Sequence, residues 1–176
     1  MTRHTKILFF SAILGAVATA VVPVTALAQT HPYSDSVTGV EVYATSTEGV
    51  FTGTASGALP GTWTADVLHT PLSGTPETAT ITGGSFDLAT ALNKNYVVIT
   101  GTFVRDGGSV AQTGGFSGCV DQTYSVNGAL DKVGVYGKAH RGSGNFSATL
   151  THYRLPIFAY CLTYGASIAG NVTLSF

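Results

Sequence analysis

Apolar and polar residues alternate along most of this chain, which is the pattern of β-strands rather than of helices. In the last segment, every second position from Leu162 to Phe176 is apolar or Gly, and the positions between them are small or polar. A period of two places successive side chains on opposite faces of a strand. Similar runs lie at 36–44, 49–56, 61–70, 78–90, 96–105, 109–117, 123–132 and 143–154. Because no segment has a helical period, the pattern predicts an all-β protein.

Turn-forming residues separate these runs, and one pair of glycines interrupts a run. Pro60-Gly61 and Gly107-Gly108 are typical of turns between strands. The apolar positions are odd-numbered before Gly83-Gly84, at Ala79 and Ile81, and even-numbered after it, at Phe86 and Leu88. Such a change of face inside a strand predicts a β-bulge.

The sequence also contains an internal similarity between its two halves. Residues 61–69 resemble residues 144–152, with Gly, an aromatic residue, Ala, an aliphatic residue and His at the same offsets. Shorter pieces at 36–39, 49–51 and 79–83 resemble 125–128, 134–136 and 166–170 in the same order. We therefore predict two duplicated four-stranded units, 36–90 and 123–176, joined by a hairpin at 96–117.

Two such units can bury their apolar faces against each other. A lone four-stranded sheet has two free edges and one uncovered apolar face, and closure into a barrel removes both problems. We expect a small antiparallel β-barrel of about 8–10 strands, with a sandwich as the alternative. In either case the apolar faces point inward and the Thr and Ser residues point outward. The opposite arrangement, an outer-membrane barrel, is disfavoured because most runs offer too few apolar positions to span a bilayer.

The first 28 residues have the features of a secretory signal peptide. Arg3 and Lys6 lie in a basic segment, and an apolar run from Ile7 to Val22 follows. Ala26 and Ala28 are the small residues of an Ala-x-Ala cleavage site. We predict cleavage after Ala28, a mature domain of 29–176, and a secreted or periplasmic location. No later stretch is apolar enough for a transmembrane helix.

Composition fits an exported β-protein. Only 10% of the residues are charged against 44% hydrophobic, and without Arg3 and Lys6 the chain keeps 6 basic against 9 acidic residues. With no basic patch there is no electrostatic case for nucleic acid. The two cysteines, Cys119 and Cys161, are predicted to form a disulfide, because an even count in an exported chain indicates pairing.

Few residues are candidates for a site. His69 and His152 each follow an inward apolar residue by two positions, so each lies on the inward face at the end of its strand. If the two units are related by a pseudo-two-fold along the barrel axis, both strands run the same way and both side chains reach one end of the barrel. Arg154 continues the face of His152. A polar rim above an apolar interior, to which Trp63 and Phe146 contribute, is typical of the mouth of a ligand site. The sequence does not identify catalytic residues, a metal set or a cofactor. Most of the carboxylates, Glu41 among them, are adjacent to turns or on the outward face and are expected on the solvated surface.

Two short resemblances to known families support a small barrel. Gly61-Thr62-Trp63 at the start of a strand, with Arg154 late in the chain, resembles the Gly-x-Trp and Arg pair of the lipocalin and avidin barrels. That resemblance implies that Trp63 closes one barrel end with Arg154 packed on its ring. Residues 142–146 resemble the Gly-x-Gly-x-Phe turn of the dirigent and allene oxide cyclase barrels, which bind apolar molecules and guide their cyclisation.

Three functions remain open on the sequence alone. The first is an exported barrel that binds a small apolar ligand in its interior. The second is a structural or adhesive module whose barrel is filled by its own side chains, as small barrels usually are. The third is a cyclase- or isomerase-type enzyme that uses His69 or His152 as a proton shuttle. The sequence does not predict the oligomeric state or the identity of a ligand.

Overall fold

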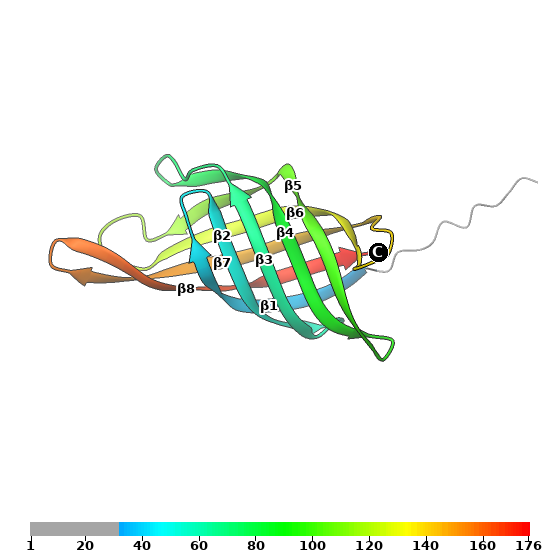
Figure 1. The fold of residues 1–176 in the computed structure, drawn as a ribbon. Helices are drawn as coiled ribbons and strands as arrows, with labels where there is room; N and C mark the ends of the chain where they lie inside the picture. The colour runs from blue at the N-terminus through cyan, green and yellow to red at the C-terminus, as the bar shows by residue number, and fades with distance from the viewer. Residues whose placement is uncertain (1–31) are drawn as a thin grey trace, which may run out of the picture.

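The structure is a computed structural model that describes residues 32–176, and these residues form eight consecutive strands (Figure 1). The expected signal peptide, 1–28, lies outside the described residues. The strands are β1 (Pro32–Ala44), β2 (Glu48–Gly57), β3 (Gly61–His69), β4 (Thr78–Leu92), β5 (Asn95–Gly114), β6 (Gln122–Val135), β7 (Gly142–Ile157) and β8 (Tyr160–Ser175).

The eight strands close into an antiparallel barrel. Each strand pairs with its neighbour in the sequence, and β1 also pairs with β8 along Pro32–Val40 and Ser167–Ser175. This topology confirms the predicted small barrel and replaces the alternative of a sandwich. Closure leaves no free sheet edge along the body of the barrel. Among residues 32–176, no helix is long and apolar enough to cross a membrane.

The interior of the barrel is filled with apolar side chains. Trp63, Phe86, Phe103 and Phe146 are each no more than 2% exposed, and the ring of Phe146 lies 5.9–6.1 Å from the other three ring centroids. The alternation therefore places apolar residues inward, as predicted. Outward positions carry mainly hydroxyl and amide groups, as in Ser147, Thr149 and Thr151 of β7, which is the reverse of a lipid-exposed barrel.

The predicted bulge at Gly83-Gly84 is confirmed. Pairing of β4 with β5 shifts between Thr80 and Ser85, and Gly84 has a φ of 124°. A Cβ atom at Gly84 would overlap the backbone carbonyl of Asp66, so only glycine allows β3 and β4 to approach so closely. The bulge moves Phe86 and Leu88 to the inside.

The predicted hairpin at 96–117 is wrong. This segment belongs mainly to β5, a single strand of 20 residues. Its pairing with β6 shifts between Phe103 and Gly108, and Asp106 has a φ of 60°. The turn-like sequence Asp106-Gly107-Gly108 therefore forms a bulge within the strand instead of reversing the chain. As a result, residues 123–176 supply three strands rather than four.

Two of the four matched pieces of the internal similarity lie on equivalent strands of the barrel, and the other two do not. The best-matched pieces lie on β3 and β7, which are four strands apart in the ring of eight, and the 79–83 and 166–170 pieces lie on β4 and β8. The two upstream matches both fall wholly or mostly on β6, so they do not occupy equivalent places. Duplication of the barrel halves stays a prediction.

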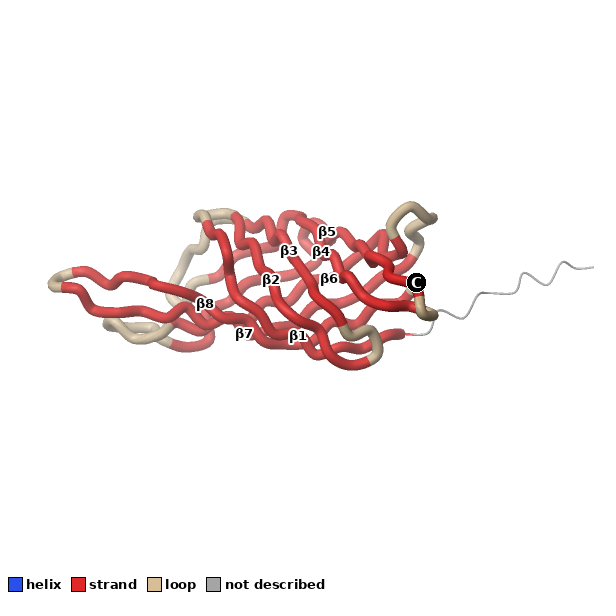
Figure 2. Tube along the Cα trace, turned by 60° about the horizontal axis from the view of Figure 1, so that its bottom comes forward, coloured by secondary structure: helices blue, strands red, loops and turns tan. Residues whose placement is uncertain are grey.

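One hairpin projects beyond the barrel (Figures 1 and 2). Residues 153–165 of the β7–β8 hairpin pair with each other, but the pairing of β7 with β6 ends at His152 and that of β8 with β1 ends at Ser167. We call residues 153–165 the arm, the end of the barrel that carries it the arm end, and the end with Phe176 the tail end. Tyr164, expected inside the barrel, is exposed because the alternation continues where the barrel has ended.

Candidate functional site

A cavity opens at the arm end of the barrel, and it contains both predicted histidines. Its volume is about 60 Å³. Its floor is apolar and is formed by inward side chains of five strands, Phe51, Val67, Val110, Val126 and Leu150. His69 and His152 lie on its wall because β3 and β7 run in the same direction and end at the same rim. We call this space the mouth cavity.

Glu41 holds the ring of His152 at the wall of the mouth cavity. Nε2 of His152 and Oε2 of Glu41 are 3.0 Å apart, and their side chains are only 20% and 11% exposed. Because a carboxylate accepts but does not donate, the Nε2–H of His152 donates to Glu41. The pair fixes the orientation of the His152 ring through Nε2, and the other ring nitrogen, Nδ1, takes no part in it.

Glu41 was expected on the solvated surface, and the structure shows that this expectation is wrong. The side chain shares its face of β1 with Gly39 and with buried Val37, two and four residues earlier. Strand parity therefore points it inward at the rim, where the barrel still shields it from water. Strand parity could have predicted this inward position of Glu41 but not its partner, His152.

A second polar group lies beside His152. The hydroxyl of Tyr124 donates to Oε2 of Glu77 at 2.7 Å, and the ring centroids of Tyr124 and His152 are 5.4 Å apart. Burial raises the pKa of Tyr124 above its usual range, and the hydrogen bond and negative charge of Glu77 raise it further. The phenol therefore remains a neutral hydrogen-bond donor at the mouth.

Gln112 positions Glu77 from the adjacent strand. Its side-chain oxygen accepts from the backbone N–H of Glu77 at 3.3 Å, and its amide donates to the carbonyls of Gly114 and Gly115. Gln112 is one of the few buried polar residues of the barrel. Neither Glu77 nor Gln112 was a candidate. Glu77 lies in a loop, whereas Gln112 follows the inward Val110 by two residues, so strand parity was the signal that could have identified it.

His69 lines the same mouth cavity as His152 but has a different hydrogen-bond partner. Nδ1 of His69 lies 2.7 Å from the carbonyl oxygen of its neighbour Thr70. The structure thus brings both histidines to one cavity but gives each a separate partner. Whether either binds a ligand stays a prediction.

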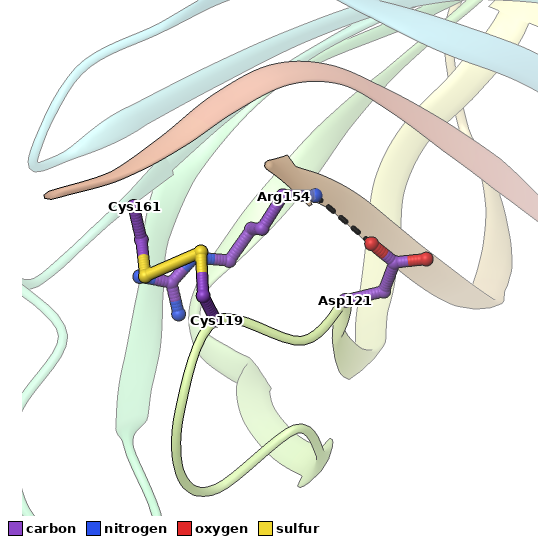
Figure 3. Close-up of a disulfide and its surroundings, with 4 residues drawn as sticks. All are labelled: Cys119, Asp121, Arg154 and Cys161. Carbon is purple, nitrogen blue, oxygen red and sulfur yellow. Dashed lines mark hydrogen bonds between the residues drawn. A yellow bond between two sulfur atoms is a disulfide. The ribbon is translucent and has the colours of Figure 1, made fainter. Parts of the chain in front are cut away.

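Arg154, the third predicted rim residue, lies at the base of the arm rather than in the mouth cavity. Its backbone N–H donates to Oδ1 of Asp121 at 2.9 Å, and its side chain extends beside the disulfide (Figure 3). That disulfide joins Cys119 to Cys161 with a Cα–Cα distance of 5.5 Å, which confirms the predicted pairing. It ties the β5–β6 loop to the arm.

Trp63 and Phe146 belong to the packed interior rather than to the mouth cavity. The indole Nε1–H of Trp63 lies 3.2 Å from the carbonyls of both Thr38 and Thr54, and its ring packs on Phe86 and Phe146. Arg154 is therefore not the partner of Trp63 that the lipocalin and avidin resemblance implied. The described residues contain no group of three or more His, Cys, Asp or Glu that could hold a metal ion.

Protein-family models, characterised proteins and solved structures were compared with the chain, and none of them matches it. The class is therefore given by the fold alone, a closed eight-stranded antiparallel barrel with a filled interior.

Proposed function

We propose that the mature chain is an exported barrel that binds a small amphipathic ligand at its mouth. The supporting observation is the mouth cavity, in which an apolar floor lies directly below the Glu41–His152 pair. Binding sites for small molecules combine a mostly apolar surface with a few fixed polar groups. The barrel interior itself is occupied by aromatic side chains, so this proposal moves the ligand from the interior to the rim.

The size and charge of the mouth cavity suggest which ligands it takes. An engineered apolar cavity of about 150 Å³ holds benzene, so about 60 Å³ suits a small alkyl group and leaves the rest of the ligand outside. Glu41 and Glu48 both line the cavity. The polar end of the ligand is therefore a hydrogen-bond donor or a cation, such as an amine.

Export is supported by the disulfide and by the N-terminal sequence. Disulfides persist in oxidising compartments and are rare in the cytosol. Cys119 and Cys161 pair, and the first 28 residues have the charge and hydropathy pattern of a signal peptide.

Binding at the mouth is tested by titrating the mature protein with n-hexylamine and, separately, with hexanoate. We expect hexylamine to shift the backbone amide NMR signals of Val67 and Val126, and hexanoate to shift them less at the same concentration. Leu150→Phe, which puts a ring into the floor of the cavity, should abolish the shifts. Thr149→Phe places the same ring on the outer face of β7 and should preserve them. Equal binding by the two variants would show that the cavity is not the site.

A second candidate is a module that acts through its outer surface alone. The observation that favours it is the exposed, apolar arm, which is fixed to the barrel by the disulfide. Absence of any hexylamine or hexanoate shift, in a protein whose intact mass shows no co-purified molecule, would favour this candidate over the first.

A further inference from the structure

The two ends of the barrel differ in shape and in charge, and the differences are complementary. We propose that copies of this chain associate head to tail, with the arm of one copy seated in a cavity at the tail end of the next. This inference is independent of ligand binding in the mouth cavity, because it uses the arm and the opposite end of the barrel.

The arm is as apolar as a buried protein contact, but its side chains are exposed to solvent. Between Leu155 and Leu162 it carries no charged residue. Both of these leucines are half exposed, Tyr160 is 80% exposed, and Phe158 at the tip is fully exposed. Apolar side chains gathered on one projecting element mark an interaction surface, whereas scattered ones do not.

Phe158 occupies a backbone position that disfavours it. Its φ is 53°, in the left-handed region where Gly, Asn and Asp are the usual residues of a two-residue hairpin turn. Phe158 and Ala159 form the whole connection between β7 and β8. A large aromatic residue at this position gains nothing within its own barrel, so its ring is explained by a contact outside it.

The tail end holds a cavity that fits such a ring. It measures about 290 Å³, roughly twice the benzene-sized cavity of about 150 Å³. Val133, Val135 and Phe176 line it together with Lys138 and Arg141. An aromatic ring placed between these apolar residues and the two cations gains both burial and cation–π attraction. We call this space the tail cavity.

Charge also favours this orientation. Loops and strand ends at the arm end carry four carboxylates against one Arg or Lys among the described residues, Arg154; the carboxylates are Glu41, Glu48, Glu77 and Asp121. The tail end carries four of the six described Lys and Arg residues against two carboxylates, Asp35 and Asp131; the four are Lys94, Lys132, Lys138 and Arg141. Opposite ends attract in a head-to-tail contact, whereas two arm ends repel each other.

A second copy fits the arm better than a lipid surface does. The outer edges of the arm pair with no neighbouring strand, since β6 ends its pairing at His152 and β1 at Ser167. Unpaired backbone groups are costly in hydrocarbon, where water cannot hydrogen-bond to them. In a protein contact the ring can be buried while these edges stay in water.

The arm and the tail cavity lie at opposite ends of the barrel, so the contact does not close on itself. Figures 1 and 2 show the arm extending away from the end where the C-terminus lies. Such heterologous contacts build open chains rather than symmetric dimers. Association is therefore expected to continue from dimers to trimers and longer oligomers as concentration rises.

The proposal is tested by sedimentation velocity on the mature protein, 29–176, purified with its disulfide intact. We expect an open series of oligomers at high concentration and dissociation as NaCl rises from 50 to 500 mM, because salt screens the attraction between the ends. Phe158→Asn, which suits a positive φ and adds no charge, should weaken association by at least about tenfold. Tyr43→Asn removes an exposed aromatic residue from the same end but outside the arm, and should leave association unchanged.

A mixing experiment distinguishes head-to-tail contacts from contacts between two arms. Ala139→Phe places a ring in the tail cavity from an exposed loop position, so the variant has an intact arm and no free cavity. Phe158→Asn has the reverse defect. Each variant alone should be monomeric, and an equal mixture should form dimers and nothing longer.

Three results would overturn the proposal. One is a mature protein that stays monomeric up to millimolar concentration. Another is an Ala139→Phe variant that associates as well as the wild type, which would indicate contacts between arms. The third is a monomeric protein that binds phosphatidylcholine vesicles through Phe158, which would make a lipid surface the partner of the arm.

Discussion

At the scale of single residues, the buried polar groups at the mouth give the sharpest predictions. Tyr124 donates to Glu77 from a buried position, and its pKa lies above the usual value of about 10. The phenol ionises in the unfolded chain before it does so in the barrel. Its contribution to stability is therefore complete below about pH 10 and is lost as pH rises through the folded pKa.

Tyr124→Phe removes this contribution. At pH 7 we expect the variant to be less stable than the wild type by about 1–2 kcal/mol, because a hydrogen bond to a charged group is lost. The difference should narrow above about pH 10, where the wild type begins to lose stability that the variant never had. Urea unfolding at pH 7 and at pH 10.5 measures both values. A difference that widens with pH would contradict the assigned direction of the pKa.

Asp35 gives a second prediction at this scale. It is 2% exposed, and its Oδ1 accepts from the backbone N–H of Leu59 at 2.7 Å across the turn that joins β2 to β3. Asp35→Ala leaves that N–H without a partner in a buried place and should cost about 1–3 kcal/mol. Asp35→Asn keeps an acceptor and should cost less. Thermal melts of the two variants decide whether the hydrogen bond or only the volume of the side chain matters.

At the scale of strands, most of the barrel followed from alternation, and the exceptions have local causes. The strands and their inward faces could be predicted because neighbouring residues in a strand point to opposite faces, so the apolar residue of each neighbouring pair marks the inward face. Strand β5 could not, since Asp106-Gly107-Gly108 suits a turn and a bulge equally well, and only pairing with β4 and β6 distinguishes them. The exposure of Tyr164 could not be predicted either, because alternation does not reveal where a strand leaves the barrel.

The disulfide is the element that fixes the arm and the β5–β6 loop to each other. Its two cysteines are 42 residues apart, and the chain-entropy model assigns roughly 4 kcal/mol to closing a loop of that length. We expect the Cys119→Ser, Cys161→Ser double variant to unfold at lower urea concentration. Core amides of β2 and β3, which exchange by global unfolding, should exchange faster as the free energy of unfolding falls. The arm and the loop at 115–121 should exchange faster as well, through local opening of the segments that the disulfide holds together. Unchanged exchange in the arm and the loop would contradict this local role.

At the scale of the whole molecule, the sequence predicted closure of the barrel and one end where the site would lie, but not the state of its interior. His69 and His152 could be placed at one rim because β3 and β7 have equal parity and direction. The Glu41–His152 and Tyr124–Glu77 pairs depend on contacts between residues far apart in the sequence. The spacing of residues along the chain does not predict such long-range contacts.

The interior of the barrel would hold a ligand only if its own aromatic side chains were removed. Phe146 is 1% exposed and packs on Trp63, Phe86 and Phe103. Phe146→Ala should therefore cost about 3–5 kcal/mol, because the surrounding rings cannot collapse into the space. The space left is apolar and enclosed, so benzene should bind there and partly restore the melting temperature of the variant. The wild type should show no such rise, since the ring of Phe146 already occupies the position that benzene would take. An equal rise in both proteins would mean that benzene binds elsewhere, and a rise in the wild type alone would mean that the native barrel already encloses a ligand site.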